Sequence, residues 1–477
     1  MQFPFGNAAL ALLVFATGAG IGLAFVDRRA ALSTPRPDIV FATFTKEHAD
    51  AYGPAVESFE KQHNVKVSVQ VVSQRALQGR LQSAMQVGAE VPDMVEILGG
   101  TMGMFVRGPI EDVGFVDLND RVRAAGLDRT LVPGRFGLWS SRGHQFALPH
   151  DVHPVMLAYR KDLVEKLSID VTKLTTWEEF VRVGREVTKD LNGDGVLDRY
   201  MIDLPSEGSD ALRLLLLQRG VALFDDAGNV TFDDPKAAEV VCWYVRQTVK
   251  RDVGDQRTAF PVGWGQTLAR SMIDGVCLFY FCPDWRTMQF QMDVQAVSGK
   301  MGLMPLPAWE PGGIRTSTWG GTGLAITKQC KDQDLAWKLA MHLYYDPQQL
   351  GPRFGDTNIL PPLTSAWAQP EFSRPSEFFS GAVIGREYAA LADQVPNDPT
   401  STSVSSANGK LSEAFQNVAI RYREKGDEGL EAYALQELKR CADRVRVVVS
   451  RNVFLKEGES SENAPGSRER VMGRVTR

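Results

Sequence analysis

A short histidine-rich segment carries the residue types that bind transition metals. His150 and His153 flank Asp151 in the run His150-Asp151-Val152-His153, and two imidazoles with a carboxylate suit zinc. Residues two apart in a strand share one face, so this segment would supply only two donors to a metal ion, which is too few for a closed site. The spacing therefore favours another role, in which the segment contributes Asp151 to a ligand-binding cleft.

The segment 190–198 matches the first half of a calcium-binding EF-hand loop. The oxygen ligands at positions 1, 3, 5 and 9 of such a loop would be Asp190, Asn192, Asp194 and Asp198. Gly195 stands at position 6, but Met201 occupies position 12, where an EF-hand has a bidentate Glu. Two interpretations remain open: a structural calcium site, or a tight Asp/Asn/Gly turn between a helix and a strand.

Motifs that would indicate catalysis are missing from the sequence. The chain has no G-x-S-x-G nucleophile elbow, no P-loop, no H-E-x-x-H and no G-x-G-x-x-G after its first predicted strand. Paired carboxylates for glycoside hydrolysis cannot be recognised in a sequence, because the fold sets their separation. We therefore expect a protein that is not an enzyme and needs no cofactor, with a secreted glycoside hydrolase as an alternative.

Length and composition bound the architecture and the partners. A chain of 477 residues with 44% hydrophobic and 23% charged residues exceeds the size of one domain, so two lobes are expected. The net charge of −5 argues against nucleic acid, because phosphate binding needs clustered Lys and Arg. The five cysteines form no C-x-x-C pair, which predicts mostly buried thiols.

Strands and helices alternate in the first part of the chain. Segments 38–44, 66–72 and 94–98 read as strands, and segments 51–62 and 77–87 read as helices with one apolar face. This βαβαβ order predicts a parallel sheet covered on both faces. Ligands of such sheets bind beyond the carboxyl ends of the strands.

Helix-start signals continue further along the chain. Thr176 and Glu179 form a Thr-x-x-Glu capping box, and Asp234 followed by Pro235 reads as an N-cap with proline in the first turn. A short strand is expected at 323–327, followed by a helix at 335–344. The polar segment 456–477 is expected to be a disordered tail.

The N-terminal segment is apolar enough to cross a membrane. Residues 8–26 carry no charge, and their length of about 19 residues is close to the ~20 that a membrane-spanning helix needs. We expect residues 1–30 to be a transmembrane anchor or a signal segment, followed by a linker at 31–37. Arg28 and Arg29 follow the apolar stretch, which opposes export by the positive-inside rule, although long domains cross largely regardless of charge.

Several motifs occur in the order found in family 1 extracellular solute-binding proteins, and the chain resembles this family over roughly residues 38–447. These receptors of ABC importers include the maltose-binding-protein-like sugar receptors. The motifs are Phe59-Glu60-Lys61-Gln62, Val91-Pro92-Asp93-Met94-Val95, Phe146-Ala147-Leu148-Pro149, Ala158-Tyr159-Arg160-Lys161-Asp162-Leu163, Thr176-Trp177-Glu178-Glu179-Phe180 and Trp319-Gly320-Gly321-Thr322-Gly323-Leu324-Ala325-Ile326. The sequence departs from the family in three places. No lipoprotein cysteine follows the apolar start, Arg160 stands where Asn is usual, and Phe44 stands where sugar binders often have Trp.

The resemblance implies an α/β protein with the two-lobed periplasmic-binding-protein type II fold and crossover strands at the hinge. It implies that residues 38–150 form lobe 1 and that residues 151–310 mainly form lobe 2. Residues 311–455 would return to lobe 1 and add the C-terminal helices.

The resemblance also implies a cleft lined by loops from both lobes. Sugars present C–H faces and hydroxyl edges, so a sugar site needs aromatic rings together with polar groups. The candidate rings are Phe44, Trp264, Trp285 and Trp319, and each has core packing as its alternative. Gly320 and Gly321 would let the backbone approach a ligand closely. The polar candidates are Glu47, Gln74, Asp151 and Arg353, each with a solvated surface position as its alternative.

The resemblance implies a receptor that closes around a small polar ligand and delivers it to an ABC permease. A mono- or oligosaccharide is the expected ligand, and a polyamine, an anion or a metal ion is the alternative. A ligand that touches both lobes would shift the population towards the closed form. We expect a monomer held at the outer face of the cytoplasmic membrane by its N-terminal helix.

Overall fold

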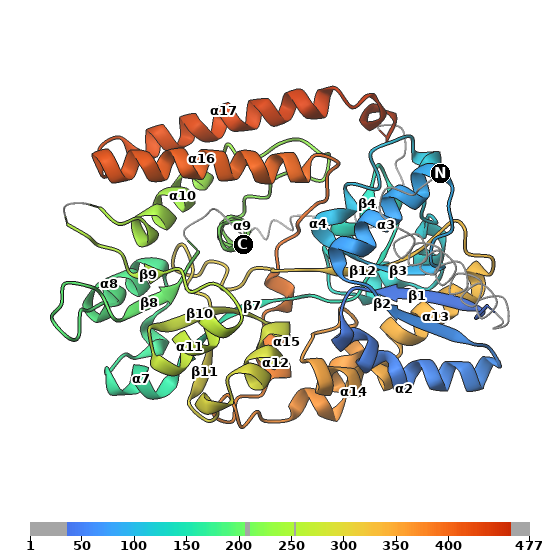
Figure 1. Ribbon diagram of the computed structural model, residues 1–477, viewed down its shortest axis with the longest axis horizontal. Helices are drawn as coiled ribbons and strands as arrows, with labels where there is room; N and C mark the ends of the chain where they lie inside the picture. Colours follow the sequence, from blue (N-terminus) through green and yellow to red (C-terminus); the bar gives the residue numbers. More distant parts are fainter. Residues whose placement is uncertain (1–35, 206–209, 252–253, 459–477) are drawn as a thin grey trace, which may run out of the picture.

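Two five-stranded sheets form the centres of two lobes in the computed structural model (Figure 1). The structure describes residues 36–205, 210–251 and 254–458. The strand order is β2-β1-β3-β12-β6 in lobe 1 and β11-β7-β10-β8-β9 in lobe 2. The predicted two-lobed α/β fold is therefore confirmed.

In lobe 1, three parallel strands are extended by two further strands through antiparallel pairings, β12 with β3 and β6 with β12. The parallel strands are β1 (Ile39–Thr43), β2 (Val67–Val71) and β3 (Met94–Leu98), and the chain later adds β6 (Leu148–Pro149) and β12 (Thr322–Ile326). Leu324 and Ile326 face one buried cluster and Ala325 faces another, because successive strand side chains alternate between the faces. The helices of this lobe are α2 (Lys46–His63), α3 (Gln74–Val87), α4 (Gly99–Met102), α5 (Asn119–Ala124), α6 (Leu127–Thr130) and α13 (Gln333–Tyr345).

The first helix begins five residues earlier than the apolar pattern predicts. The hydroxyl of Thr45 accepts a hydrogen bond from the backbone N–H of His48 at 3.0 Å and so caps α2. A cap of this kind satisfies one of the free N–H groups of the first turn, and the helix starts where that cap stands.

Lobe 2 is built on the same plan, with strand side chains alternating between two buried clusters. Its strands are β7 (Val155–Arg160), β8 (Tyr200–Asp203), β9 (Ala259–Phe260), β10 (Cys277–Pro283) and β11 (Met301–Pro305). Its helices are α7 (Lys161–Lys166), α8 (Trp177–Val187), α9 (Asp210–Gln218), α10 (Pro235–Thr248), α11 (Gln266–Asp274) and α12 (Asp284–Asp293). Both bonds of the predicted capping box between Thr176 and Glu179 are present at the start of α8. All five cysteines are free and buried, as predicted.

Three segments cross between the lobes. The first, 150–154, joins β6 to β7, and the second, 306–321, joins β11 to β12. After α14 (Pro347–Thr357) the chain crosses a third time at 358–360 and continues to α15 (Ile384–Ala389). Backbone bonds tie these segments to one another, since Val152 donates to the carbonyl of Leu360 and Pro154 bridges to Thr318.

The C-terminal helices α16 (Val404–Lys425) and α17 (Leu430–Ser450) pack together and against α10 of lobe 2 (Figure 1). Their ends reach lobe 1, where Arg107 Nε donates to the carbonyl of Thr402 at 3.2 Å and Asn452 Nδ2 donates to the carbonyl of Arg107 at 3.1 Å. The pair therefore spans both lobes.

None of the helices in the described ranges is long and apolar enough to cross a membrane. The predicted anchor at 8–26 lies outside these ranges, and so does the predicted tail from residue 459 onward.

Candidate ligand-binding site

Three of the four predicted aromatic residues lie together where the second crossing segment meets lobe 2. Trp264 precedes α11, Trp285 lies in the first turn of α12, and Trp319 belongs to the crossing segment. The rings of Trp264 and Trp285 are stacked, with centroids 6.5 Å apart and planes 11° apart. Trp319 meets them edge-on at 5.7 and 6.0 Å. Trp264 is 55% exposed, so the cluster presents an aromatic surface to solvent.

A buried arginine lies against this tryptophan cluster. The guanidinium of Arg286 is 4.4 Å from the centroid of Trp264 and 5.4 Å from that of Trp319, which is the geometry of a cation–π contact. The indole N–H of Trp285 donates to the carbonyl of Trp319 at 3.0 Å. These contacts fix the rings relative to one another before any ligand arrives.

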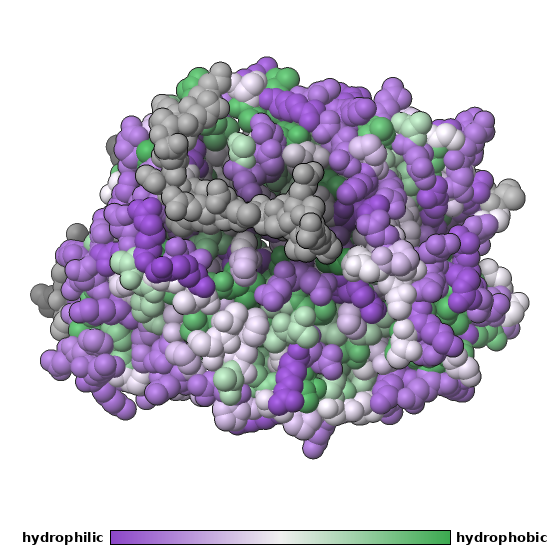
Figure 2. Space-filling model, turned by 180° about the vertical axis from the view of Figure 1, so that it is seen from behind, coloured by the Kyte–Doolittle hydropathy of each residue, from purple (hydrophilic) through white to green (hydrophobic). Residues whose placement is uncertain are grey.

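Lobe 1 has a small, open hollow at the carboxyl ends of β1 and β3. Phe44 and Gln74 are two of its lining residues, and Glu96 and Leu98 of β3 also line it. A second small hollow lies beside Trp264 and Phe290 in lobe 2. Each hollow is lined by one lobe alone. One face of the molecule is mainly hydrophilic, with hydrophobic residues scattered among the hydrophilic ones (Figure 2).

Gly320 and Gly321 connect the tryptophan cluster to the end of β3. Their φ angles of +106° and +136° are conformations that other residues rarely adopt. The carbonyl of Gly321 accepts a hydrogen bond from the N–H of Gly99 at 2.8 Å. A side chain on Gly321 would come within 2.8 Å of Leu138. Only glycine fits this backbone path beside the hollow of lobe 1.

Asp151 is buried in the first crossing segment and bonds to the protein itself. Its Oδ2 lies 3.0 Å from His153 Nε2 and accepts the backbone N–H of Thr322 at 2.9 Å. Arg135 lies beside it, with Nη2 at 3.6 Å from Oδ1. His153 Nδ1 lies 2.6 Å from Asp284 Oδ1. Burial disfavours a charge on His153, but the two carboxylates outweigh this and raise its pKa to about 10.

The remaining two polar candidates lie elsewhere. Glu47 is exposed in the first turn of α2. Arg353 of α14 is buried, donates to the carbonyl of Leu343 at 2.7 Å and stacks over the rings of Tyr52 and Tyr344. The structure thus brings together Trp264, Trp285, Trp319, Gly320, Gly321 and Asp151, and it places Phe44 and Gln74 at the hollow of lobe 1.

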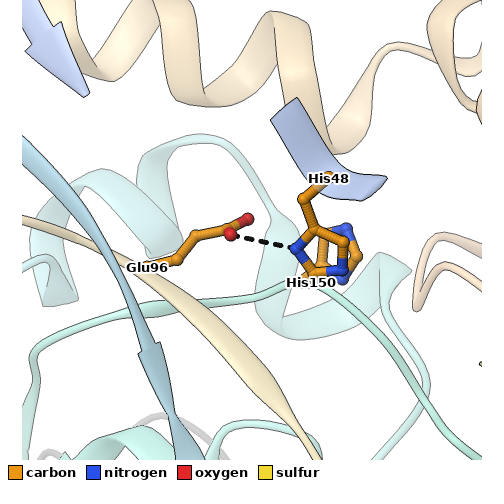
Figure 3. Close-up of side chains that lie close together, drawn as sticks. All are labelled: His48, Glu96 and His150. Carbon is orange, nitrogen blue, oxygen red and sulfur yellow. Dashed lines mark hydrogen bonds and ion pairs between the residues drawn. The ribbon is translucent and has the colours of Figure 1, made fainter. Parts of the chain in front are cut away.

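A buried polar cluster in lobe 1 lies outside the predicted set. His48 Nδ1 is 2.9 Å from Glu96 Oε2, and the rings of His48 and His150 have centroids 4.8 Å apart (Figure 3). The hydroxyls of Tyr52 and Tyr344 both donate to Glu96 Oε1, at 2.5 and 2.6 Å. His150 thus lies beside His48. The one signal in the sequence was Glu96, a charged residue in an otherwise apolar strand.

Comparison with known proteins decides the family. The sequence model of the bacterial extracellular solute-binding proteins matches residues 54–380. The chain belongs to this family. The predicted family is therefore confirmed, and with it a binding protein that acts outside the cytoplasm and is not an enzyme.

Two curated relatives of this solute-binding protein are arabinooligosaccharide-binding proteins. The one from Halalkalibacterium halodurans is 25% identical over 350 residues, covering 72% of this chain and 75% of the relative. The one from Bacillus subtilis is 23% identical over 307 residues, covering 63% and 67%.

Solved structures share the fold. The sugar-binding protein MalE from Xanthomonas citri is 21% identical with a TM-score of 0.67, covering 87% of this chain and 99% of its own. An ABC substrate-binding protein from Listeria monocytogenes, in complex with cycloalternan, is 16% identical with a TM-score of 0.66, covering 86% and 98%.

The predicted calcium loop of the solute-binding protein is an exposed turn closed by its own backbone. Asp190 accepts the N–H groups of Gly193 and Gly195, each at 2.7 Å, and these bonds lower the pKa of its carboxyl group. Asp198 accepts the N–H of Leu191 at 2.7 Å. Carboxylates held in this way can still bind an ion through their remaining lone pairs, so calcium binding stays a prediction.

Proposed function

We propose that this solute-binding protein captures an oligosaccharide between its two lobes and delivers it to an ABC permease. The exposed tryptophan cluster carries the proposal. Its stacked and edge-on rings offer flat apolar faces that match the C–H faces of pyranose or furanose rings. The arabinooligosaccharides named for the two curated relatives are the first ligands to test.

Lobe closure supplies the remaining contacts. The tryptophan cluster lies at the second crossing segment, and the lobe 1 hollow with Phe44 and Gln74 lies beyond Gly320 and Gly321. A sugar chain longer than one ring would touch both, and so would favour the arrangement in which the lobes approach. An apolar segment at residues 8–26 would hold the receptor at the membrane surface, close to its permease.

A titration followed by tryptophan fluorescence tests this function. Arabinose oligomers of increasing length are added to the full chain, with the polyamine spermidine, phosphate and Zn²⁺ as probes of the other solute classes. We expect a saturable change with an oligosaccharide, at micromolar affinity typical of about −8 kcal/mol, and unaltered sugar in a chromatogram of the mixture. A response to one of the other solutes alone would assign a different ligand, and released shorter sugars would contradict a binding protein.

A further inference from the structure

We propose that His48, Glu96 and His150 bind a transition-metal ion of the Zn²⁺ class, at a site that shares Glu96 with the hollow of lobe 1. The three side chains come from α2, β3 and the first crossing segment, and one ligand atom of each lies within 4.8 Å of the others (Figure 3). All three side chains are buried. Residues this far apart in sequence meet here only because the fold of lobe 1 brings them together.

His150 is oriented as a metal ligand would be. Its Nδ1 lies 3.1 Å from Asp151 Oδ2, while its Nε2 is buried and has no hydrogen-bond partner among the described residues. His150 itself is 1% exposed. Burial of a ring nitrogen without a hydrogen-bond partner costs free energy, because its hydrogen bond to water is lost and not replaced. Histidines that bind metals have this arrangement, in which a carboxylate holds the second nitrogen.

Glu96 is held in place by other groups. Tyr52 and Tyr344 donate to Oε1, and Thr43 donates to Oε2. Oε2 also faces His48 Nδ1 at 2.9 Å. A metal ion bonded to both His48 and Glu96 would replace this one hydrogen bond and leave the tyrosine bonds intact.

The donor set selects the class of ion. Two imidazole nitrogens and one carboxylate suit Zn²⁺ and related ions, whereas Mg²⁺ and Ca²⁺ prefer six or more oxygen ligands. The guanidinium of Arg353 stacks on the same two tyrosines, and its positive charge repels cations. A cation held by charge alone, without bonds to nitrogen ligands, is therefore disfavoured. Zn–N and Zn–O bonds of about 2.0–2.2 Å place tetrahedral ligand atoms roughly 3.4 Å apart, so a pair at the present limit of 4.8 Å must approach by roughly 1.5 Å.

Occupancy would join three parts of lobe 1. The ion would connect the start of α2, the middle of β3 and the residue that opens the first crossing segment. Since Asp151 follows His150 and accepts the N–H of Thr322, which directly follows the second crossing segment, the ion would also stiffen the hinge.

Cobalt spectroscopy on the full chain tests the site. The protein is stripped with a chelator and titrated with Co²⁺, whose visible absorption is intense in tetrahedral sites, and Zn²⁺ is then added as a competitor. We expect about one Co²⁺ per chain with tetrahedral bands that Zn²⁺ abolishes. His150→Phe keeps the ring packing but removes the ligand, and should weaken binding at least roughly 10-fold. His144→Ala removes an exposed histidine paired with Asp117 and serves as the matched control.

The fold of each variant is checked by circular dichroism and by a cooperative thermal transition. If His150→Phe does not fold, His150→Gln replaces it, since its amide can still bond to Asp151. Absence of the tetrahedral bands in the wild-type protein would overturn the proposal. So would equal binding by the wild type and a folded His150 variant, because the ion would then lie elsewhere.

Discussion

His153 Nδ1 lies 2.6 Å from Asp284 Oδ1, and this pair links the first crossing segment to the start of α12 in lobe 2. Asp284 Oδ2 in turn accepts the backbone N–H of Leu360, in the third crossing segment. Asp151, on the other side of His153, accepts the N–H of Thr322, the residue of β12 that directly follows the second crossing segment. One imidazolium between two carboxylates therefore connects all three segments of the hinge.

The charge on His153 predicts a pH-dependent stability. Its pKa is about 10 in the folded protein against about 6.5 when unfolded, so its stabilisation is fully present below pH 6.5 and is lost as the pH rises through 10. His153 has a φ of +53°, which Asn tolerates. We expect His153→Asn to lower the unfolding free energy by a few kcal/mol at most near pH 6, at about 1.4 kcal/mol per pKa unit, and by much less near pH 10. Urea unfolding at both pH values measures this, and equal losses at both would contradict a charged His153.

The exposed ring of Trp264 is expected to contribute to sugar binding more than to folding. Trp264→Ala should weaken the best oligosaccharide about 10-fold or more, as loss of an aromatic anchor does. Its melting temperature should change little, because the ring is 55% exposed. Trp337→Ala in α13, where the ring stacks under Arg121, is the control for loss of a tryptophan outside the site. Unchanged affinity in Trp264→Ala, measured by calorimetry, would remove the ring from the site.

Gly321 is expected to tolerate no side chain. Gly321→Ala meets both a backbone conformation that disfavours Ala and a contact of 2.8 Å with Leu138, so we expect a loss of about 2–3 kcal/mol in unfolding free energy. Gly312→Ala also has a positive φ but nothing within 4 Å, and should cost only about 1 kcal/mol. Denaturant unfolding compares the two. Equal losses would show that backbone strain alone accounts for the effect.

Calcium binding at the 190–198 loop has its own test. We expect Ca²⁺ to raise the melting temperature only at about 0.1–1 mM, the range of weak extracellular sites, because Met201 replaces the twelfth ligand. Asp190→Asn should abolish this increase. If the wild-type melting temperature does not respond to Ca²⁺, the loop is a turn and no more.

Local patterns predicted much of the fold, because they depend on neighbours in sequence. The βαβαβ order and the capping box at Thr176 follow from alternation, apolar spacing and side-chain caps. The contacts within the site follow from chain crossings that no local pattern encodes. Trp264, Trp285 and Trp319 were each candidates, but nothing in the sequence placed them in contact. Arg353 looked like a cleft residue, whereas the tyrosine rings of α2 and α13 bury it in lobe 1.

The helical pair α16 and α17 has a mechanical consequence. It packs against α10 of lobe 2, yet its two ends form hydrogen bonds with Arg107 of lobe 1. Any rotation of one lobe against the other must either carry these ends along or break the bonds, each of which contributes about 1 kcal/mol. The pair would thus oppose rotation of the lobes. The free energy needed to break its hydrogen bonds to Arg107 would be part of the cost of binding and releasing the ligand.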